Sequence, residues 1–460
     1  MNVVVHRVHD RGASDVGPPH GLDEPGRPRA ATLMRRAWAM TTVAARHATT
    51  VGWHAASARL CGRTVDETKA FPRQIRLALE EIGPTFVKLG QLLSSRSDVV
   101  SPRLQHELAM LRDHAPSLPR TTVVAELERS LGSDPTEHFA SFEIGPVACA
   151  SIGQVHRAKL RDGRRVAVKL RRPAVRAQID TDISLLRIVL QFAMHVSRTA
   201  RTYDPVALLG EFAAMLRAET DYRLEAENIE VVRRAFPDGD VVAIPKVMTE
   251  LSSESLLVME WIDGIPLTRA DELDAAGTNR PAVARAIMHA YAQMMFQSER
   301  FHADPHPGNL IAQPDKRLGL VDFGEVGSID ADTRNALIRL LVAVLGRNSD
   351  ALGRAVVDVS RSTRRVDRGQ LGDALAAMLA PITDATLQDI RLGAVLRDLL
   401  HVMRRNALVL PADLAVLLKT VIECEGTTNE IDPAFSMSNF LTELGERVGF
   451  VNDDRGRSGP

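Results

Sequence analysis

Apolar residues recur with a helical period in some parts of the chain and alternate with polar residues in others. Residues 70–131 have helical spacing, and prolines divide this stretch into short predicted helices: Pro72, Pro84, Pro102 and Pro119. Residues 139–171 alternate instead, and Asp162-Gly163 is typical of the turn between two hairpin strands. Helical spacing returns at 174–234. The first half of the chain therefore predicts helices, a small antiparallel sheet, and helices again.

The second half of the chain is predicted to be mostly helical. Two short strands are expected near 241–247 and 256–262, and helical spacing dominates from residue 280 onward. Two irregular stretches, HADPHPGN and LGLVDFGEVG, interrupt these helices, and no internal repeat is visible. We therefore predict an α+β protein whose parts are a disordered tail (1–30), a helical N-terminal extension (31–137), a lobe with the sheet (138–262), a helical lobe (263–445) and a flexible tail (446–460).

Composition narrows the class of protein. The 460 residues suit two or three domains, and 45% hydrophobic with 25% charged residues is the balance of a soluble globular protein. The formal net charge of −1 provides no strong field that would attract nucleic acid, so we expect no nucleic-acid partner. Three distant cysteines exclude a disulfide framework or a CxxC zinc motif within the chain. No apolar run of ~20 residues is present, so we expect a cytoplasmic protein.

A lysine on the predicted hairpin is the first candidate for chemistry. Lys169 ends the sequence VAVK on the second strand, where alternation places Val166 and Val168 on the opposite face from the lysine. A lysine at such a place can reach the α- and β-phosphates of a nucleotide. A carboxylate would have to hold its flexible ammonium, and the acids of 205–234 supply candidates: Glu219, Asp221, Glu225 and Glu227. A solvated helix face would explain the same acids.

Two loops in the helical half carry residues typical of metal-dependent phosphoryl transfer. Asp304 and Asn309 in HADPHPGN have the D-x-x-x-x-N spacing of a kinase catalytic loop, in which the aspartate orients a nucleophile and the asparagine binds Mg²⁺. Asp322 begins DFG after an apolar strand and would also face Mg²⁺. An ordinary proline-rich turn is the alternative for the first loop, but the ordered combination of all three motifs favours a nucleotide site.

Further motifs connect the chain with a known family. GPTFVKLGQLLSSRSD at 83–98 has no counterpart in ordinary protein kinases, and it is accompanied by ACASIGQVHRA, VAVKLRRP, ETDYRLEAEN, VMEWIDGIPL, HADPHPGNL and VDFGEVG. From about residue 70 to about residue 440 the chain resembles the UbiB family of atypical kinase-like proteins, the aarF-domain or ADCK group. The resemblance implies a two-lobed, protein-kinase-like α+β fold, with 138–262 as the N-lobe and 263–445 as the C-lobe. The helical extension over 31–137 would pack over the active site.

The resemblance implies a gate formed by two motifs. Lys88, Gly90 and Gln91 match the KxGQ signature of the family's N-terminal extension. Glu219 and Asp221 match its ExD motif, and Glu219 is the expected partner of Lys88. In the family this extension covers the place where a protein kinase accepts a peptide. We therefore expect these residues to control access to the nucleotide site.

The resemblance further implies ATP and Mg²⁺ as the cofactors. The expected catalytic residues are Asp304, Lys169 and Glu225, of which Glu225 holds Lys169, and the expected metal-binding residues are Asn309 and Asp322. An alanine-rich loop is expected to replace the glycine-rich loop of ordinary kinases over the phosphates, through Ala148, Cys149, Ala150, Ser151 and Gly153. Side chains in this loop keep its backbone further from phosphates than glycines would. The hinge toward the adenine is expected near Met259-Glu260-Trp261.

The expected function follows from these motifs and from what is missing after DFG. Residues 325–329 are followed directly by a predicted helix, and no A-P-E motif ends an activation segment. A peptide substrate would have little platform, so the leading expectation is an ATP-binding, Mg²⁺-dependent kinase or ATPase that acts on a small molecule or lipid. By resemblance, it would support isoprenoid-quinone or other membrane-lipid metabolism. Two alternatives stay open: a Ser/Thr protein kinase, and a non-catalytic, nucleotide-gated lipid-binding scaffold.

A basic stretch near the N-terminus indicates one further contact. Residues 25–65 contain seven arginines and no acid. On a helix, Leu33, Ala37 and Met40 share one face and the arginines lie opposite, so the helix could rest on an anionic lipid surface at the inner face of the cell membrane. Trp53 falls on the arginine side, which favours the alternative, a helix packed on the body of the protein.

The choice between lysine and arginine supports the nucleotide site independently. The chain has 50 arginines and only seven lysines, so arginine is its usual cation. Lys88 and Lys169 lie where the expected chemistry needs a compact, mobile ammonium instead of a planar guanidinium. Other polar residues are expected to be structural. His302 and His306 would shape the catalytic loop, and the helices of 331–445, with Glu423 and Glu425, would pack the lobe and keep solvated faces.

Overall fold

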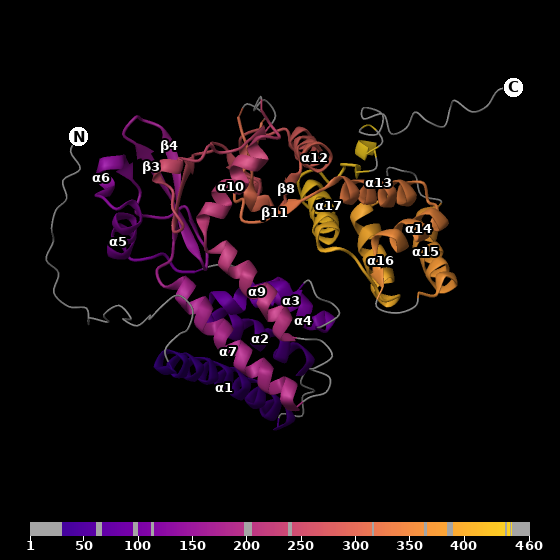
Figure 1. Cartoon of the computed structure of the whole chain (residues 1–460), viewed down its shortest axis with the longest axis horizontal. Coiled ribbons are helices and arrows are strands. Elements are labelled where there is room, and N and C mark those ends of the chain that lie inside the picture. Colours follow the sequence, from indigo (N-terminus) through magenta and orange to yellow (C-terminus); the bar gives the residue numbers. More distant parts are fainter. Residues whose placement is uncertain are drawn as a thin grey trace. The chain divides into compact units, whose positions relative to one another are not determined.

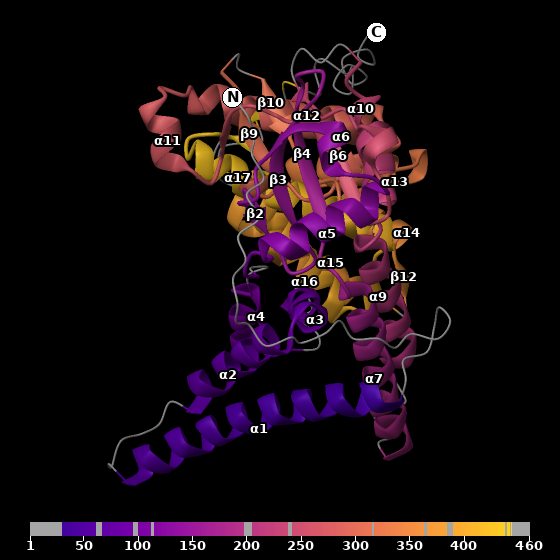
Figure 2. The same ribbon diagram turned by 90° about the vertical axis from the view of Figure 1, so that its left-hand side faces the viewer.

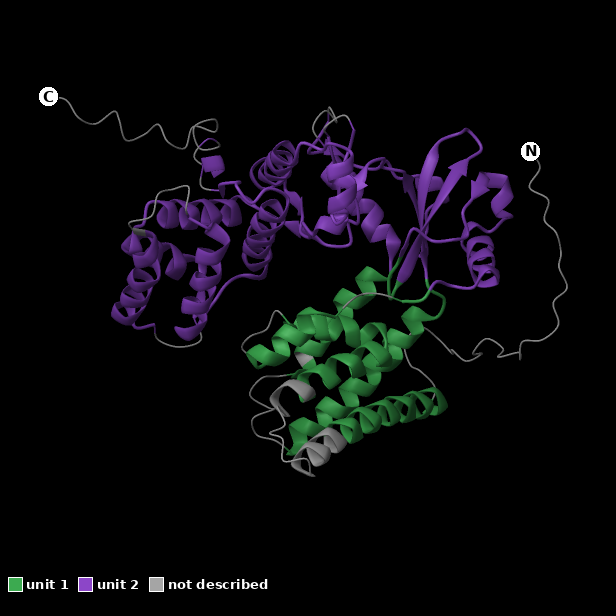
Figure 3. Ribbon diagram, turned by 180° about the vertical axis from the view of Figure 1, so that it is seen from behind, with its two compact units in different colours: residues 1–116, 149–152, 172–220 green, residues 117–148, 153–171, 221–460 purple. Residues whose placement is uncertain are grey.

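The computed structural model describes most of the chain and divides it into two compact units. The described residues are 30–60, 67–94, 100–111, 115–196, 205–237, 242–314, 317–362, 366–383, 390–437, 439–441 and 443. Unit 1 comprises residues 1–116, 149–152 and 172–220, and unit 2 comprises residues 117–148, 153–171 and 221–460 (Figure 3). Apart from residue 30, the predicted tails over 1–30 and 446–460 lie outside the described residues.

Unit 1 is built of helices (Figure 1). They are α1 (Ala30–Leu60), α2 (Glu67–Ile82), α3 (Pro84–Ser94), α4 (Pro102–Ala109), α7 (Val175–Val196) and α9 (Pro205–Glu219). α1 lies against α2 and α7, and α7 lies against α9 (Figure 2). The apolar faces of α7 and α9 share one buried core through Ile179, Ile183, Phe212 and Leu216. Residues 172–220, within the range predicted for the N-lobe, therefore group with the N-terminal helices.

Of the three prolines predicted to divide the helices of unit 1, two begin a helix and one does not. α3 begins at Pro84 and α4 at Pro102, as predicted. α2 instead continues through Pro72, so the predicted helix boundary there is wrong. A proline inside a helix removes one backbone hydrogen bond. α2 tolerates this loss because it packs against α1, α3 and α4, and such packing supplies most of the stability of a helix in a protein.

Arginines of α1 are used inside unit 1. Arg36 donates from Nε and Nη2 to the carboxylate of Asp182 on α7, at 2.6 and 2.9 Å, and Arg46 pairs with Glu81 on α2. Leu33, Ala37 and Met40 are half-buried on the same helix. These contacts are those of a helix packed on the body of the protein. The side chain of Trp53 lies outside the described side chains, and contact with a lipid surface stays a prediction.

Asp182 joins three helices of unit 1. Besides Arg36 of α1, it accepts a hydrogen bond from the Thr85 hydroxyl of α3 at 2.8 Å, and its side chain is fully buried. A buried carboxylate is stable in a protein only with such partners. The acid therefore fixes the register of α1, α3 and α7.

Replacing Asp182 with alanine should lower the free energy of unfolding by about 3 kcal/mol, because it leaves a largely buried guanidinium and a buried hydroxyl without their acceptor. Asp180 on the same helix provides the control, since it pairs with Arg217 near the surface. Asp180→Ala should cost less than about 1 kcal/mol. Urea denaturation of both variants measures the difference, and equal losses would contradict the role of Asp182.

Unit 2 contains an antiparallel sheet of five strands in the order β1-β3-β4-β6, with β2 paired to β3. The strands are β1 (Phe139–Phe142), β2 (Ala148–Cys149), β3 (Gly153–Leu160), β4 (Arg165–Arg171) and β6 (Leu256–Glu260). Gly163, with φ 94°, lies in the turn between β3 and β4, where the Leu160 amide donates to the Arg164 carbonyl at 2.9 Å. The predicted hairpin at Asp162-Gly163 is confirmed.

The two faces of this sheet have different partners. Val166 and Val168 are buried on one face with Val123 and Leu127 of α5 (Arg120–Leu131), next to α6 (Pro135–His138) (Figure 1). Ala167 points to the other face, into the core that includes α10 (Tyr222–Arg233). The alternation predicted along VAVK is therefore confirmed, and it directs Lys169 toward α10.

The remainder of unit 2 is mainly helical. Its helices are α11 (Ala270–Ala275), α12 (Arg280–Gln297), α13 (Ala331–Leu345), α14 (Ser349–Val359), α15 (Arg368–Thr383), α16 (Leu392–Arg405) and α17 (Ala412–Ile431), with the 3₁₀ turns η1 (Thr249–Leu251) and η2 (Pro307–Asn309). Short strands complete it: β5 (Val242–Ala243), β7 (Ile265–Pro266), β8 (Arg300–His302), β9 (Leu310–Ala312), β10 (Leu318–Leu320), β11 (Val326–Ser328), β12 (Arg361–Ser362) and β13 (Leu408–Val409).

Strand pairing brings the two predicted functional loops together. β9 and β10 are antiparallel neighbours in a four-stranded sheet of order β5-β10-β9-β7, and β8 pairs with β11. The loop with Asp304 joins β8 to β9, and the loop with Asp322 joins β10 to β11. Each loop therefore connects the β8–β11 pair to the β9–β10 pair, which brings Asp304 and Asp322 to the same region. Among the described residues, no helix is long and apolar enough to span a membrane.

Candidate active site

The lysine of the hairpin meets two carboxylates on the face of the sheet that α10 covers. Lys169 Nζ lies 2.8 Å from both carboxylate oxygens of Glu225 on α10 and 3.2 Å from Oδ1 of Asp322. α10 presents Glu225 because Tyr222 and Ile229 of the same helix are buried in the core of unit 2. Three elements distant in sequence thus place one cation and two anions in contact.

The electrostatics of this cluster preserve its charges. Burial lowers the pKa of Lys169, but the carboxylates of Asp322 and Glu225 raise it more, so its pKa lies above the usual value. The ammonium of Lys169 lowers the pKa of Asp322, whose side chain is about half exposed, to about 2. Burial raises the pKa of Glu225, although Lys169 opposes the rise. At neutral pH Lys169 is therefore protonated and Asp322 is ionised. The ionised form of Glu225 is stabilised by the nearby charge of Lys169.

The catalytic-loop candidates also lie in contact. Asn309 Nδ2 donates to Oδ2 of Asp304 at 2.7 Å, and the Val321 amide donates to the Asn309 carbonyl at 3.0 Å. The second bond places Asn309 beside the residue that precedes Asp322. His306 shapes the loop, because its Nδ1 accepts a hydrogen bond from the Gly308 amide at 3.0 Å. This contact agrees with the structural role predicted for His306.

Asp322 has an unusual backbone conformation. Its φ is 60°, in the left-handed region that costs a residue with a side chain of order 1 kcal/mol or more. His302 stabilises it, because Nε2–H donates to the Asp322 carbonyl at 2.9 Å while Nδ1 accepts from the Tyr291 hydroxyl at 2.9 Å. Burial lowers the pKa of His302, which keeps the ring neutral, as this pair of bonds requires. His302 is therefore structural, as predicted.

Sequence reasoning missed a residue that fixes the DFG loop. Asn228 Nδ2 donates to the Phe323 carbonyl at 3.0 Å. Asn228 lies three residues after Glu225 on α10, so the two side chains share one face of the helix. It ends the quoted run ETDYRLEAEN, and this helical spacing was the available signal. α10 thus holds both the strand lysine and the DFG backbone.

The fit of nucleotide phosphates to these residues can be tested on Tyr222. Its side chain is buried, and its hydroxyl has no hydrogen-bond partner among the described residues. A Cβ on Gly153 would lie 2.1 Å from this hydroxyl, so glycine is required for the tyrosine to pack there. Lys169 Nζ lies 5.4 Å from the centroid of the Tyr222 ring. A buried hydroxyl without a partner costs about 1–3 kcal/mol, and a phosphate oxygen near Lys169 would remove this cost.

Mg²⁺ also fits the donor set. Asn309 and Asp322 offer an amide oxygen and a carboxylate, which are ligands that Mg²⁺ prefers. Within the described ranges no group of three or more His, Cys, Asp and Glu side chains could hold a metal ion alone. Mg²⁺ commonly uses one or two protein ligands and completes its shell with phosphates and water. The donor set therefore suits a metal that binds together with a nucleotide.

The predicted phosphate loop is held by an arginine. In unit 1, Arg172 donates from Nε to the Ala150 carbonyl at 2.9 Å and from its backbone amide to the Ile152 carbonyl at 2.8 Å. Cys149 is half-buried and Ser151 is buried, whereas Ala148 is exposed. Arg172 directly follows the strand of Lys169 in the sequence, so it offered no separate signal. The phosphate-binding role of the loop stays a prediction.

Two backbone amides of the predicted hinge already donate hydrogen bonds within the protein. The Glu260 amide donates to the Lys246 carbonyl at 2.8 Å, and the Trp261 amide donates to the Arg165 carbonyl at 3.0 Å. Met259 is buried, and the Arg157 guanidinium stacks 4.4 Å from the centroid of the Trp261 ring. An adenine contact at these residues would therefore use other backbone groups than these two amides. The hinge assignment stays a prediction.

The KxGQ residues of unit 1 have individual contacts. Lys88 Nζ donates to Oε1 of Glu219 at 2.9 Å, joining α3 to α9. A Cβ on Gly90 would lie 2.2 Å from Leu111 Cδ1, so glycine allows close packing there. Gln91 Nε2 donates to the Leu111 carbonyl at 3.4 Å. The expected partner of Lys88 is thus in contact with it, whereas gating by these residues stays a prediction.

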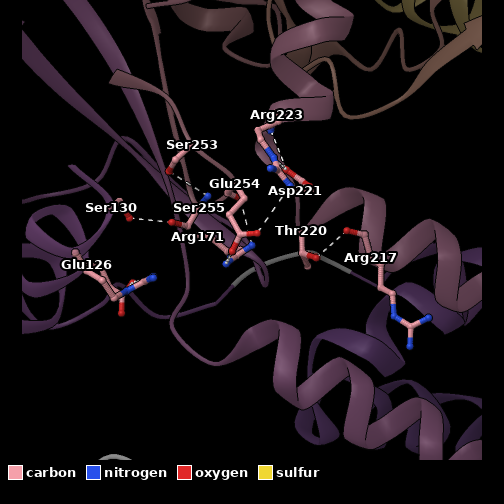
Figure 4. Close-up of polar contacts among 11 residues, drawn as sticks. Glu126, Ser130, Arg171, Arg217, Thr220, Asp221, Arg223, Ser253, Glu254 and Ser255 are labelled. Carbon is pink, nitrogen blue, oxygen red and sulfur yellow. Dashed lines mark hydrogen bonds and ion pairs between the residues drawn. The ribbon is translucent and has the colours of Figure 1, made fainter. Parts of the chain in front are cut away.

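The acids of the ExD motif belong to different units. Glu219 is part of unit 1, and Asp221 is part of unit 2. Asp221 accepts hydrogen bonds from Arg223, from Nε at 2.9 Å and Nη2 at 2.6 Å, and it caps the N-terminus of α10 (Figure 4). Glu254 pairs with Arg171 of β4 at 3.0 Å. Asp221 therefore positions the helix that carries Glu225.

Comparison with known proteins identifies the family. A model of the ABC1 atypical kinase-like domain matches residues 110–356, more than half of the chain. The chain belongs to the UbiB family. A model of the UbiB helical domain matches residues 375–436 of this UbiB member. The resemblance inferred from the motifs is thereby confirmed, and a kinase-like domain implies nucleotide binding.

One relative and one solved structure complete the comparison. The uncharacterized protein slr0889 of Synechocystis sp. is 32% identical to the UbiB member over 366 residues, which cover 77% of this chain and 89% of the relative. A solved structure from Mycobacterium tuberculosis, the complex of Rv3197 with erythromycin, has a TM-score of 0.54 at 24% identity, covering 85% of this chain and 94% of that chain. The predicted α+β, protein-kinase-like fold is confirmed.

Replacing Lys169 with methionine should destabilise the protein more at about pH 8 than at about pH 5. Without the ammonium, the pKa of Glu225 rises further above its value in the unfolded chain. A carboxyl whose folded pKa is raised loses stability as the pH climbs from the unfolded pKa to the folded one. We expect a loss of about 3 kcal/mol at the higher pH, measured by urea denaturation.

The double variant Lys169→Met/Glu225→Gln serves as the control. It removes the buried carboxylate together with its cation, so most of the added pH dependence should disappear. The charge assignment would be contradicted if the single variant lost the same stability at both pH values.

Proposed function

We propose that this UbiB member is an ATP-binding, Mg²⁺-dependent kinase or ATPase. The observation that carries the proposal is the contact of Lys169 with both Glu225 and Asp322, beside the bonded pair of Asp304 and Asn309. All five of these groups are present, which disfavours a pseudokinase without activity. Their arrangement matches the parts that phosphoryl transfer requires.

Each residue has a distinct task in the proposed mechanism. Lys169, fixed by Glu225, binds the α- and β-phosphates, and the Tyr222 hydroxyl donates to a phosphate oxygen near it. Asn309 and Asp322 hold Mg²⁺, which when bound neutralises charge on the phosphates. Asp304 accepts a hydrogen bond from the attacking hydroxyl or water and orients its oxygen toward the γ-phosphorus. The amide of Asn309 keeps the Asp304 carboxylate in place for this task.

The segment after DFG supports water or a small molecule as the acceptor. β11 begins two residues after Gly324 and pairs with β8, so that Val326 lies opposite His302. Asp330 then caps α13, accepting from the Thr333 amide at 2.7 Å. A chain that returns at once to strand and helix offers no extended activation segment for docking a peptide. This observation disfavours the alternative of a Ser/Thr protein kinase.

A role near membrane lipids is the finer part of the proposal. The family resemblance links the chain to isoprenoid-quinone or other membrane-lipid metabolism. Large apolar side chains exposed on unit 1 support a peripheral contact with the inner face of the cell membrane: Met34, Trp38, Ile188, Val189, Phe192 and Val196. Singly exposed apolar residues are common, but four within nine residues of α7 form a continuous stripe. Pairing of Lys88 with Glu219 is the proposed means of gating the site.

Replacing Asp322 with asparagine should reduce ATP turnover by roughly 100-fold or more, because the metal loses its carboxylate ligand. Asp398→Asn, at an exposed position of α16, is the matched control and should leave turnover unchanged. Phosphate release from purified protein, with and without anionic liposomes, measures the effect. Unchanged turnover in Asp322→Asn would contradict the assignment.

Measurements of phosphoryl transfer, nucleotide binding and phosphate release separate the three alternative functions. Radiolabelled γ-phosphate found on a protein substrate would favour the Ser/Thr kinase. Tight nucleotide binding without turnover would favour the scaffold. Phosphate released to water and stimulated by liposomes would favour the ATPase, and mass spectrometry of co-purified lipid would identify its ligand.

A further inference from the structure

Helix α17 is attached to both sides of Asp304. Thr427 Oγ1 donates to the Pro305 carbonyl at 2.8 Å. Thr420 Oγ1 lies 3.3 Å from the Ala303 carbonyl and 2.9 Å from the Val416 carbonyl of its own helix, so its one proton is shared between these acceptors. Both threonines are buried. Because they lie seven residues apart, they share one face of the helix, and this face runs along the catalytic loop. α17 belongs to the segment that matches the UbiB helical domain, outside the kinase-like match.

A lysine next to Thr420 reaches the segment after DFG. Lys419 Nζ lies 3.4 Å from Oε2 of Glu325 and 3.7 Å from Oε2 of Glu423. The Glu325 carbonyl accepts a hydrogen bond from the Ala303 amide at 2.9 Å, so Glu325 is adjacent to the residue before Asp304. Lys419 therefore lies where the catalytic loop and the DFG segment meet.

The charges of Lys419, Glu325, Glu423 and Asp304 act on one another. Partial burial lowers the pKa of Lys419, but the carboxylates of Glu325, Glu423 and Asp304 raise it more. Partial burial raises the pKa of Glu423 to about 7; Lys419 opposes this rise, and the charges of Asp304 and Glu325 add to it. The ammonium is therefore charged, and Asp304 is close enough to act on both residues of the pair.

The side chains assigned above to the metal, the α- and β-phosphates and the acceptor include no cation for the γ-phosphoryl group. Charge on the transferring phosphoryl group is commonly stabilised by a basic side chain besides the metal, as an arginine finger does in other phosphotransferases. Lys169 is committed to Glu225 and Asp322. The catalytic loop, ADPHPGN, contains neither lysine nor arginine, and His306 is bonded within the loop.

We propose that Lys419 contacts the transferring γ-phosphoryl group beside Asp304. The proposal rests on the function proposed above. In the transfer step the acceptor oxygen forms a bond to the γ-phosphorus, and the bond to the β–γ bridging oxygen breaks, leaving its electron pair on ADP. Asp304 takes the proton of the acceptor. Lys419 keeps its proton throughout and balances the charge on the transferred group.

The surroundings of Lys419 suit this movement. Its side chain is 47% exposed, and those of Glu325 and Glu423 are 53% and 40% exposed. Ion pairs between such exposed groups typically stabilise a protein by less than about 1 kcal/mol. Little free energy is therefore lost when the ammonium leaves a carboxylate for a phosphoryl oxygen. The two glutamates remain hydrated when the ammonium leaves them. A lysine, with its compact charge on a flexible stem, suits this exchange better than an arginine.

Equilibrium binding of two nucleotides tests the proposal without relying on turnover. Isothermal titration in Mg²⁺ buffer compares ADP with the non-hydrolysable ATP analogue AMP-PNP, which differs by carrying a γ-phosphoryl group. Lys419→Gln should weaken AMP-PNP binding by about 10-fold, a typical loss for one charge-assisted contact, and should leave ADP binding unchanged. Lys419→Arg should recover part of the AMP-PNP affinity.

Two further lysines are matched controls. Lys159→Gln, at an exposed position of β3 in unit 2, should leave both affinities unchanged. Lys169→Gln should weaken both ligands, because its proposed contact is with the phosphates that ADP and AMP-PNP share.

The outcomes separate this proposal from the function on which it rests. Selective loss of AMP-PNP affinity in Lys419→Gln supports the proposal, and the retained ADP affinity shows that the variant is folded. Unchanged affinity for both ligands overturns it while the nucleotide site stands. Equal losses for both ligands also overturn it, since they indicate a structural role. A wild-type protein that binds neither ligand overturns the proposed function and this proposal together.

Discussion

The contact of the half-buried Lys169 ammonium with Glu225 and Asp322 is the interaction on which the arrangement of unit 2 depends. It joins a strand, a helix and a loop, because β4 supplies the lysine, α10 supplies Glu225 and the DFG loop supplies Asp322. A shift of one residue in the pairing of β4 would turn the lysine toward the face covered by α5. The register of the sheet therefore decides whether the three charges meet. Asp221 and Asn228 secure the helix and the loop on either side of this contact.

Local patterns in the sequence predicted much of this arrangement. Alternation placed Val166 and Val168 on one face of the strand, and the Asp162-Gly163 turn defined the hairpin, because both depend on neighbours in the chain. The spacing of Asp304 and Asn309 within one short loop was equally local. These features use short-range geometry, which a sequence displays directly.

Contacts between distant segments could not be predicted in this way. The Tyr222 hydroxyl packs against Gly153, on another element, at a place where a Cβ would clash with it. The hydrogen bonds of Thr420 and Thr427 with the catalytic loop connect residues more than a hundred positions apart. α2 continues through Pro72 because neighbouring helices hold it. Rare lysine usage did offer a signal for Lys419, one of seven lysines, but a helix rich in apolar residues obscured it.

The contacts of α17 with the carbonyls on both sides of Asp304 also concern how the two domains depend on each other. The helix lies in the segment matched by the UbiB helical domain, and the aspartate lies in the segment matched by the kinase-like domain. A protein cut between the two domains would lack the hydroxyls of Thr420 and Thr427. The buried carbonyls of Ala303 and Pro305 in the catalytic loop would then lose these contacts. The helical domain is thus an internal brace for the loop instead of an appendage. Recombination that exchanged one domain without the other would have to recreate these contacts between α17 and the catalytic loop. The two segments are therefore expected to be inherited as a pair.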